Sequence, residues 1–449
     1  MKNFPTSLLG QRVVVLGGGV SGTAALRLLK ERQANAVLCN SQPVPDSDVP
    51  FVGEDVILAD LLPIALIVKS PGISPSHSVL SQASSLAIPV VSEVELARAF
   101  YSGKLIGVTG TDGKSTTTSL STHLVSSDFP GATAGGNIGL AFSDFCLKPI
   151  PLAVLELSSY QLEDSGPLEL NVSVILNLAS DHLERHKNLD NYFAAKTRIV
   201  DSSNSQHTLV TSSKLYRERI QKLGWSCKIL VFGREVGNDA FISEEDRTIK
   251  TAKSVYDAKN FPLPGGHNLD NLAASILAAE AIGAKPENIQ TLLGTFKGLP
   301  HRFQNAGKAA GISFINDSKS TNLHSMLAGL NTWKDKKGTF LILGGRPKAE
   351  PLEPLRDFLN SGIGWVLLIG EARATWESII SPILGSHLIT ANNLEEGFAE
   401  IKTAVRSGRA RVSSVIFSPA CASFDLYKNF EERGEHFLRL VSDWSKEEP

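Results

Sequence analysis

The sequence predicts an α/β protein with three domains. The first observation is length, because 449 residues are too many for one ordinary hydrophobic core. The second is an alternation of short apolar runs with amphipathic helical patterns, and the third is the glycine-rich or polar turn that follows several of these runs. We expect the domains to occupy residues 1–94, 95–298 and 299–449.

Composition limits the classes of function. The 44 basic and 46 acidic residues leave a formal charge of −2, which argues against nucleic acid as a partner. The cysteines, at positions 39, 146, 227 and 421, form no Cys-x-x-Cys pair, so neither a disulfide framework nor a thiolate zinc site is expected. No signal peptide or membrane span is expected either. We therefore expect a cytoplasmic monomer that binds neither nucleic acid nor membrane.

A glycine-rich turn follows the first apolar run. Residues 12–16 have the pattern of a buried strand, and Gly17-Gly-Gly-Val-Ser-Gly22 leads into an amphipathic helix that ends near residue 31. This is the dinucleotide-binding fingerprint G-x-G-x-x-G in its strand-turn-helix context. The N-terminal domain is therefore predicted to be Rossmann-like.

The second strand of this domain indicates its ligand. The strand near residues 36–38 ends in Cys39-Asn-Ser41, where a nicotinamide-binding domain would place an Asp or Glu on the ribose. This favours a nucleotide diphosphate over NAD, and a purely structural tight turn is the other alternative. A third strand at 64–68 leads into Ser70-Pro-Gly72, which we expect at the same edge of the sheet.

The central domain begins with a phosphate-loop pattern, Thr109-Gly-Thr-Asp-Gly-Lys-Ser-Thr116, directly after an apolar run at 105–108. The general Walker pattern requires glycine where this chain has Val108, so the pattern here is a narrower one. The alternative is a glycine-rich turn with a surface lysine. A phosphate loop would use backbone N–H groups, a cationic side chain and a hydroxyl for magnesium, here at Gly110, Gly113, Lys114 and Ser115. We therefore predict a P-loop mononucleotide-binding domain.

A carboxylate follows the next buried strand of the central domain. The strand at 152–155 ends in Glu156, a position from which a carboxylate can hold magnesium directly or through water. The alternative is an acid that caps a helix. Upstream, Asn137 lies in the glycine-rich stretch 135–139 and offers a polar group in a flexible backbone.

Two histidines follow a strand predicted at 172–178. His182 and His186 are four residues apart and could share a helical face that binds zinc, but no third ligand with recognisable spacing accompanies them. We interpret His182 as part of a magnesium and substrate site, and His186 as a solvated helix residue. Lys196 has the pattern of a surface lysine on an amphipathic helix.

An alanine-rich helix follows residues 263–267. Asn268 is placed to cap it, and Asn268 and Asn271 lie three apart on one helical face, where they could contact a base or ribose. Capping alone is an equally serious interpretation of Asn268.

The last domain is predicted to be a second Rossmann-like sheet. Its strands are expected at 312–315, 340–343, 365–369 and 412–417. Ligands bind at the carboxyl ends of strands in such sheets, so the turns at 301–302, 317–321, 344–348 and 418–425 are expected to line one site. Cys421 is interpreted as a small buried residue and not as a nucleophile, because no base is indicated beside it.

Together these features suit an enzyme that uses ATP to join an acid to an amine. The acid would take the γ-phosphoryl group to give an acyl phosphate, and the amine would then displace phosphate through a tetrahedral intermediate.

The order of motifs along the whole chain resembles the Mur ligases of peptidoglycan synthesis. The motifs are the phosphate loop 109–116, 136–139, 155–159, 181–182, 195–196, 267–268, 301–302 and 316–322. The run Ser418-Pro-Ala-Cys-Ala-Ser-Phe-Asp-Leu-Tyr-Lys-Asn-Phe430 resembles the branch of that family that adds D-glutamate. The resemblance implies ATP-dependent addition of D-glutamate to UDP-N-acetylmuramoyl-L-alanine, with ATP and Mg²⁺ as cofactors.

The resemblance also implies roles for individual residues. The catalytic set is Lys114, Glu156, His182, Lys196 and Lys319. ATP contacts fall on Gly110, Thr111, Gly113, Lys114, Ser115, Thr116, Asn268, Asn271, Arg302 and Asp317. The metal ligands are Ser115, Glu156, His182 and Lys196, the last as a carbamylated lysine.

Substrate contacts are implied in the same way. The UDP substrate would contact Val20, Ser21, Asn40, Ser41, Ser70, Gly72, Asn137, Ser158 and His182. D-Glutamate would contact Thr321, Lys348, Ser423, Phe424 and Phe430.

The chain departs from the family pattern at three places. Asp112 stands where Asn is usual in the phosphate loop, Arg346-Pro347 replaces more common acidic or glycine residues, and Phe424 replaces a smaller aliphatic residue. We expect Asp112 to point away from the phosphates or to contact magnesium through water.

Two alternative functions each conflict with one feature of the sequence. A folylpolyglutamate synthase-like ligase shares the central chemistry, but the complete first domain with its nucleotide turn argues against it. A nucleotide-switched binding protein without ligase activity leaves the grouping of Glu156, His182 and Lys196 unexplained.

Overall fold

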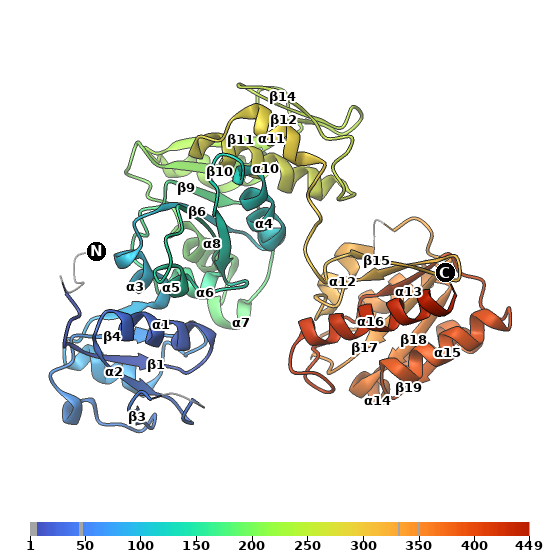
Figure 1. The fold of residues 1–449 in the computed structure, drawn as a ribbon, viewed down its shortest axis with the longest axis horizontal. Coiled ribbons are helices and arrows are strands. Elements are labelled where there is room, and N and C mark those ends of the chain that lie inside the picture. The colour runs from blue at the N-terminus through green and yellow to red at the C-terminus, as the bar shows by residue number, and fades with distance from the viewer. Residues whose placement is uncertain (1–6, 45–47, 331–332, 349, 449) are drawn as a thin grey trace. The chain divides into compact units, whose positions relative to one another are not determined.

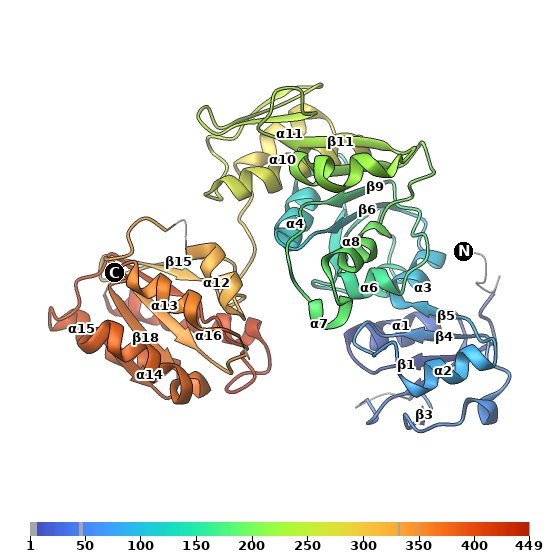
Figure 2. The same cartoon turned by 180° about the vertical axis from the view of Figure 1, so that it is seen from behind.

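A computed structural model describes residues 7–44, 48–330, 333–348 and 350–448, and these residues form three sheets with helices packed against them (Figures 1 and 2). The chain divides into two compact units, Met1–Lys297 and Gly298–Pro449. The first unit contains two of the sheets and the second unit contains the third. The predicted α/β class is confirmed, while the exact domain boundaries stay a prediction.

The N-terminal sheet has the strand order β3-β2-β1-β4-β5, and every neighbouring pair is parallel. The three valines of β1 are fully buried, because helices cover both faces of the sheet. The strands are β1 (Arg12–Leu16), β2 (Asn35–Cys39), β3 (Phe51–Val52), β4 (Leu66–Lys69) and β5 (Val90–Ser92). The helices are α1 (Val20–Glu31), α2 (Ser78–Ser85) and α3 (Glu93–Phe100).

The central sheet has the order β14-β13-β12-β11-β10-β9-β6-β8-β7, with antiparallel pairing confined to β12, β13 and β14. Its parallel strands are β6 (Lys104–Thr109), β7 (Thr133–Gly136), β8 (Leu152–Glu156), β9 (Val172–Ile175), β10 (Thr208–Ser212) and β11 (Lys228–Gly233). The remaining strands are β12 (Ala240–Ser243), β13 (Thr248–Thr251) and β14 (Val255–Asp257).

Helices cover the central sheet on both faces, as Figure 1 shows for α4 and α8. The helix α10 is buried along most of its length and packs against α4, so the alanines of its sequence allow the two helices to approach closely. The helices are α4 (Lys114–Val125), α5 (Phe142–Phe145), α6 (Ser159–Glu163), α7 (Leu183–His186), α8 (Leu189–Thr197), α9 (Ser213–Leu215), α10 (Gly266–Ile282) and α11 (Pro286–Leu293).

The C-terminal sheet has the order β15-β16-β20-β17-β18-β19, and β15 is its antiparallel edge strand. Its strands are β15 (Gln304–Ala309), β16 (Ile312–Asn316), β17 (Thr339–Gly344), β18 (Trp365–Ile369), β19 (Leu388–Ala391) and β20 (Ser414–Phe417). Its helices are α12 (Leu323–Leu330), α13 (Glu353–Asn360), α14 (Arg373–Leu384), α15 (Leu394–Arg406) and α16 (Phe430–Glu447). None of the helices in the described ranges is long and apolar enough to cross a bilayer.

The predicted apolar strands are confirmed within a few residues at each end, except that β9 ends at Ile175 and not at Leu178. Strands with little apolar periodicity were not predicted. The strand β7 reads Thr-Ala-Gly-Gly, and β15 is half exposed at the sheet edge, where its polar side chains face solvent. Hydrogen bonding to a neighbouring strand, and not residue type, makes these segments strands.

A buried ion pair joins the N-terminal sheet to the segment that follows α6. Lys69, the last residue of β4, is 2% exposed and pairs with Asp164. The next residue of that segment, Ser165, shares a 2.8 Å hydrogen bond with Ser92 at the end of β5. Because Lys69 directly precedes the Ser70 turn, this contact connects a predicted substrate turn to the central sheet.

We predict that Lys69→Met lowers the free energy of unfolding by about 2 kcal/mol, because it leaves the partly buried Asp164 carboxylate without its ion-pair partner. Urea unfolding measures the loss. The double variant Lys69→Met/Asp164→Leu should recover most of it. Arg27→Met, which breaks the more exposed pair with Asp144, serves as the control with an expected loss below about 1 kcal/mol. Equal losses for Lys69→Met and Arg27→Met would contradict the prediction.

Candidate functional site

The carboxyl ends of three neighbouring parallel strands place the central groups side by side. The strand β6 lies between β8 and β9. Glu156 is the last residue of β8, and the loop 110–113 and Asn177 follow β6 and β9, so all three lie at one edge of the sheet. Consecutive strands of this sheet diverge from β6 to opposite sides, and α/β sheets bind ligands at such a switch point.

The phosphate loop has the backbone that its glycines allow. Gly113 has a φ of 80°, in the left-handed region, and a side chain there would overlap with Asn271 at the start of α10. The helix α4 begins at Lys114, and no side chain caps its first turn. The N–H groups of that turn can therefore bind an anion.

Asn177 holds the loop in shape, a role that we did not predict. Its Oδ1 accepts hydrogen bonds from the backbone N–H groups of Thr111 (3.0 Å) and Asp112 (2.9 Å), and its Nδ2 donates to the Asp112 carbonyl (3.1 Å). Those two amides are thus engaged, so the loop amides that can bind an anion are the ones from Gly113 onward. The signal in the sequence was an asparagine just beyond the end of a buried strand.

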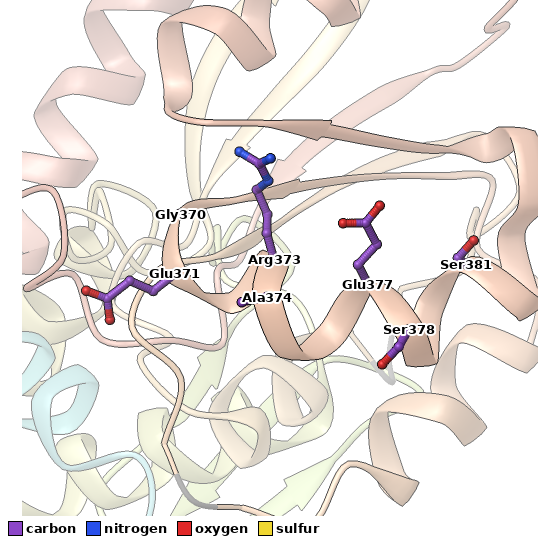
Figure 3. A pocket seen from close by; sticks show the side chains of 7 residues that line it. All are labelled: Gly370, Glu371, Arg373, Ala374, Glu377, Ser378 and Ser381. Atoms are coloured by element: carbon purple, nitrogen blue, oxygen red, sulfur yellow. The ribbon is translucent and has the colours of Figure 1, made fainter.

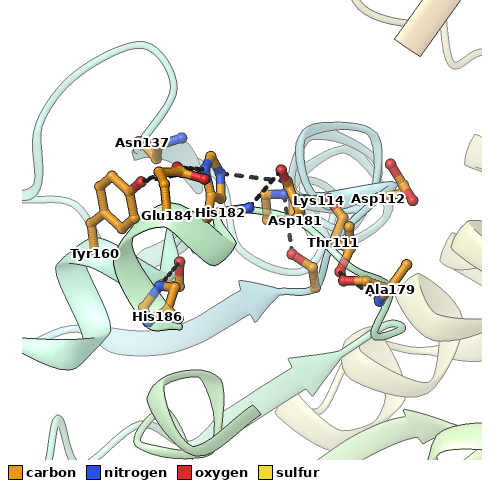
Figure 4. Close-up of polar contacts among 12 residues, drawn as sticks. Thr111, Asp112, Lys114, Asn137, Tyr160, Ala179, Asp181, His182, Glu184 and His186 are labelled. Carbon is orange, nitrogen blue, oxygen red and sulfur yellow. Dashed lines mark hydrogen bonds and ion pairs between the residues drawn. The ribbon is translucent and has the colours of Figure 1, made fainter. Parts of the chain in front are cut away.

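The side chain of Asp112 is exposed and points away from the other labelled residues in Figure 4. The placement of this carboxylate relative to bound phosphates or magnesium stays a prediction.

Glu156 is a buried carboxylate fastened by two neutral donors. It is 2% exposed, its Oε2 accepts a hydrogen bond from the Ser115 hydroxyl, and its Oε1 accepts one from Asn137 Nδ2 at 2.9 Å. The helix-capping alternative is wrong, because Ser158 caps α6 in a reciprocal pair with Gln161. Glu156 is therefore available to a ligand at the loop.

Lys196 is buried, so its interpretation as a surface lysine is wrong. It is 1% exposed, its Nζ donates to the Gly110 carbonyl at 2.7 Å, and it lies 4.2 Å from the centre of the Tyr192 ring. Burial, aided by the positive charge of Lys114, lowers the pKa of Lys196 to about 6. The amine is therefore neutral at physiological pH.

Lys114 converges on the same carbonyl. Its Nζ donates to the carbonyls of Gly110 (3.1 Å) and Thr111 (2.6 Å). Two lysine side chains thus flank one turn of the phosphate loop. Because the Lys196 amine is neutral, the positive charge that favours an anion at this turn comes from Lys114.

The two histidines differ in their surroundings, as Figure 4 shows. His182 precedes α7, is half exposed, and its Nδ1 lies 3.4 Å from the Tyr160 hydroxyl. His186 is buried, with Nε2 3.0 Å from the Ser159 hydroxyl, so its predicted solvation is wrong. Burial lowers the pKa of His186. His186 therefore joins α7 to α6, and its position on the inner face of α7 explains the burial.

Asn268 does not cap α10, because Gly265 occupies the cap position and the helix begins at Gly266. Instead, Asn268 Oδ1 accepts a 3.2 Å hydrogen bond from Asn271 Nδ2. The two side chains share one face, as predicted, and Asn271 also contacts Thr117 of α4. They lie beside the first turn of α4.

The N-terminal turns meet as predicted for one sheet edge. Ser70 donates to the Gly17 carbonyl at 3.0 Å, and a side chain at Gly18 would come within 2.8 Å of Asn40 Nδ2. Val20 is 72% exposed beside these groups, and a Cβ at Gly22 would overlap with the Gly17 carbonyl. Residues of the turns after β1, β2 and β4 therefore form one surface. Ser41 and Gly72 belong to these turns, and Ser21 lies in the first turn of α1.

In the C-terminal unit, Asp317 connects two turns. Its Oδ2 accepts hydrogen bonds from the hydroxyls of Ser320 (2.6 Å) and Ser418 (2.7 Å), and burial raises the pKa of Asp317 to about 6. Lys319 Nζ lies 3.8 Å from the centre of the Phe430 ring. The turns after β16 and β20 therefore pack together.

Other predicted residues of this unit differ in exposure. Ser423 is buried, whereas Phe424 is 63% exposed and Lys348 is exposed. Cys421 is fully buried and burial raises the pKa of its thiol to about 12, so its interpretation as a small buried residue is confirmed.

The unusual Arg346 pairs with Glu371 through two hydrogen bonds of 2.9 Å each. Glu371 also lines a depression of about 690 Å³ at the start of α14 (Figure 3). No residue predicted to bind substrate or ATP lines this depression. Its lining residues are Gly370, Glu371, Arg373, Ala374, Glu377, Ser378 and Ser381.

The donor set at the phosphate loop fits magnesium and not zinc. In the described ranges, no group of three or more His, Cys, Asp or Glu side chains is placed to hold a metal ion. Ser115 and Glu156 offer two hard oxygen donors beside a phosphate cradle. Magnesium is held in this way, by one or two protein oxygens together with substrate phosphates and water.

Comparison with known sequences identifies the family to which the segment with the phosphate loop and Glu156 is similar. Residues 108–279 match the family described as the Mur ligase middle domain. The UDP-N-acetylmuramoylalanine--D-glutamate ligase of Leptospira interrogans (strain Fiocruz L1-130) is 55% identical over 455 residues, covering 98% of both chains. The enzyme of that name from Aquifex aeolicus is 33% identical over 438 residues, covering 96% of this chain and 99% of its own.

Solved structures share the fold. MurF from Acinetobacter baumannii superposes with a TM-score of 0.63 at 17% identity, covering 98% of this chain and 92% of its own. MurF ligase from Thermotoga maritima, solved in complex with ADP, has a TM-score of 0.60 at 18% identity, covering 99% of this chain and 100% of its own.

The neutral amine of Lys196 predicts a pH-dependent difference in stability. Between its folded pKa of about 6 and the ordinary value of 10.5, only the unfolded chain binds the proton, so wild-type stability rises with pH across this window. Lys196→Met should therefore be more stable than wild type at pH 7 by more than about 1 kcal/mol, and the difference should shrink toward pH 9.5.

Urea unfolding in buffer free of carbon dioxide measures this difference. The exposed Lys222, changed to Met, provides the control and should show no such trend. A Lys196→Met difference that is independent of pH would show that the amine is charged in the folded protein.

Proposed function

The chain belongs to the Mur ligase family, and we propose that it catalyses the ATP-dependent addition of D-glutamate to UDP-N-acetylmuramoyl-L-alanine in peptidoglycan precursor synthesis. The geometric observation that best supports this is the buried Glu156 carboxylate, held by Ser115 and Asn137 against a phosphate loop. A carboxylate in that place suits a metal-assisted phosphoryl transfer.

Phosphoryl transfer would take place at the loop. A carboxylate oxygen of the muramoyl-alanine substrate attacks the γ-phosphorus, and the bond to the β–γ bridging oxygen breaks to release ADP. Lys114 and the amides from Gly113 onward would bind the phosphates, while Ser115 and Glu156 would hold magnesium. Magnesium, when bound, would neutralise charge on the phosphate oxygens.

Amide formation would follow in a second step. The amine of D-glutamate attacks the acyl carbonyl carbon and loses a proton, and the tetrahedral intermediate then expels phosphate. Lys319, Thr321, Lys348 and Ser423 would bind the two carboxylates of D-glutamate, with Phe424 and Phe430 at the edge of the site. Exclusion of water protects the acyl phosphate from hydrolysis.

We further propose that Lys196 is carbamylated in the active enzyme. A neutral amine attacks carbon dioxide, forming an N–C bond and releasing a proton, and the product carries a negative charge. The lowered pKa of Lys196 leaves the amine neutral for this reaction, and the Lys114 ammonium nearby would stabilise the anion. The carbamate could then serve as an oxygen ligand together with Glu156 and His182.

The nucleotide contacts complete the proposed roles. Thr111, Thr116, Asn268 and Asn271 lie around the first turn of α4, where they would contact ATP. Arg302 and Asp317 are assigned to ATP by the resemblance of their motifs. The surface made by the Gly17, Asn40 and Ser70 turns would bind the UDP group.

The function is tested by phosphate release from purified protein with ATP and magnesium. We expect release only when UDP-N-acetylmuramoyl-L-alanine and D-glutamate are both present, and L-glutamate is the matched control that should not replace D-glutamate. Release that is indifferent to either substrate would contradict the proposal.

Carbamylation is tested with carbon-13-labelled bicarbonate. The wild-type protein should give a carbamate carbon resonance that disappears in Lys196→Ala and persists in the control Lys222→Ala. Lys196→Ala should also lose nearly all ligase activity, and added bicarbonate should not restore it. An unchanged resonance in Lys196→Ala would place the carbamate elsewhere.

A further inference from the structure

Arg433 is a buried arginine that none of the roles above uses. It lies in the first turn of α16 and is 1% exposed. Arginine is rarely this buried, and burial lowers the pKa of Arg433 to about 10. No ion pair between Arg433 and a carboxylate occurs among the described residues. The guanidinium therefore keeps its charge inside the unit without a carboxylate in direct contact, and the charge of Asp425 acts on it from a longer distance.

Its hydrogen bonds all go to turns at one edge of the C-terminal sheet. Nε donates to the Ser318 hydroxyl (3.1 Å), Nη2 to the Ser318 carbonyl (2.8 Å) and Nη1 to the Cys421 carbonyl (3.0 Å). Ser318 belongs to the turn after β16, and Cys421 to the turn after β20. The Ser318 hydroxyl in turn donates to the Phe430 carbonyl at 2.9 Å, which closes the network.

A third turn meets the same guanidinium. Gly345, in the turn after β17, has a φ of 129°, and a Cβ there would lie 3.0 Å from Arg433 Nη1. The next residue, Arg346, exchanges two backbone hydrogen bonds with Ala422, of 2.8 and 3.0 Å. Because β20 lies between β16 and β17 in the sheet, Arg433 stands at the junction of all three turns.

These are the turns that carry the proposed D-glutamate contacts. Lys319 and Thr321 follow Ser318 in the first turn, Lys348 follows Gly345 in the second, and Ser423 follows Cys421 in the third. D-Glutamate carries two carboxylates, which a buried positive charge that makes no direct ion pair favours. The guanidinium therefore fixes the geometry of the three turns, and its positive charge favours the binding of a carboxylate beside them.

We propose that Arg433 is a positioning residue for D-glutamate, which holds the turns after β16, β17 and β20 in one arrangement through Ser318 and Cys421. This inference rests on the proposed function. It assigns Arg433 to the second half of the reaction, in which the amine attacks, and not to formation of the acyl phosphate.

The test compares Arg433→Lys with wild type. Lysine keeps the charge but lacks the planar fork that reaches three acceptors. We expect KM for D-glutamate to rise about tenfold, which corresponds to the loss of one hydrogen bond to a charged group, while KM for ATP changes less than about twofold. Arg439→Lys, on the exposed face of the same helix, is the control and should match wild type.

Acyl-phosphate formation gives a second readout. Hydroxylamine traps the acyl phosphate as a hydroxamate when D-glutamate is omitted, and Arg433→Lys should form it at the wild-type rate. If KM for D-glutamate and KM for ATP rise equally and the melting temperature falls, Arg433 has a purely structural role and the proposal is overturned. Unchanged KM values would also overturn it. If wild type itself shows no D-glutamate-dependent turnover, the proposed function fails and not this inference alone.

Ser318→Ala is a second variant that tests the same proposal if Arg433→Lys does not fold. It removes the hydroxyl that accepts from Nε and donates to Phe430, and leaves the guanidinium in place. We expect KM for D-glutamate to rise about threefold with an unchanged hydroxamate rate. A selective rise in KM for ATP would contradict the assignment.

Discussion

The buried carboxylate of Glu156 is the constraint on which the central site depends. A carboxylate that is removed from water needs hydrogen-bond donors, and here Ser115 and Asn137 supply them from two other turns. Each donor follows a different strand or begins a different helix, so the carboxylate draws the phosphate loop and the Asn137 turn together at one sheet edge. Asn177 completes this arrangement, because its side chain fixes the loop that presents Ser115.

Basic side chains that donate to backbone carbonyls recur at the sites. Lys114 and Lys196 both donate to the Gly110 carbonyl, and Arg433 donates to a hydroxyl and to two carbonyls. In each place burial penalises the charge, as the lowered pKa values of Lys196 and Arg433 indicate. Such a penalty is relieved when an anion arrives, and phosphates and carboxylates are the anions of the proposed reaction. In the unliganded protein, the cost of burying these basic groups thus falls at the places where the anionic substrates would offset it.

The sequence was sufficient to predict the fold class and most apolar strands, because buried parallel strands are continuous apolar runs. It was also sufficient for the phosphate loop, whose glycines and lysine are local signals. Burial from tertiary packing was not predictable. His186 and Lys196 have the pattern of exposed helix residues, and only the packing of α7 and α8 against α6 and the phosphate loop buries them. Asn268 looked like a cap because Gly265, the actual cap, gives no side-chain signal. The role of Asn177 needed the strand order, which local sequence does not contain.

Titration of the protein with an ATP analogue that resists hydrolysis, with and without magnesium, tests the central claim most directly. If Glu156 and Ser115 hold the metal beside the loop, magnesium will raise the affinity of wild type for the analogue. Glu156→Gln will abolish that gain while leaving the magnesium-free affinity unchanged. A Glu156→Gln variant that keeps the full magnesium-dependent gain would contradict the account.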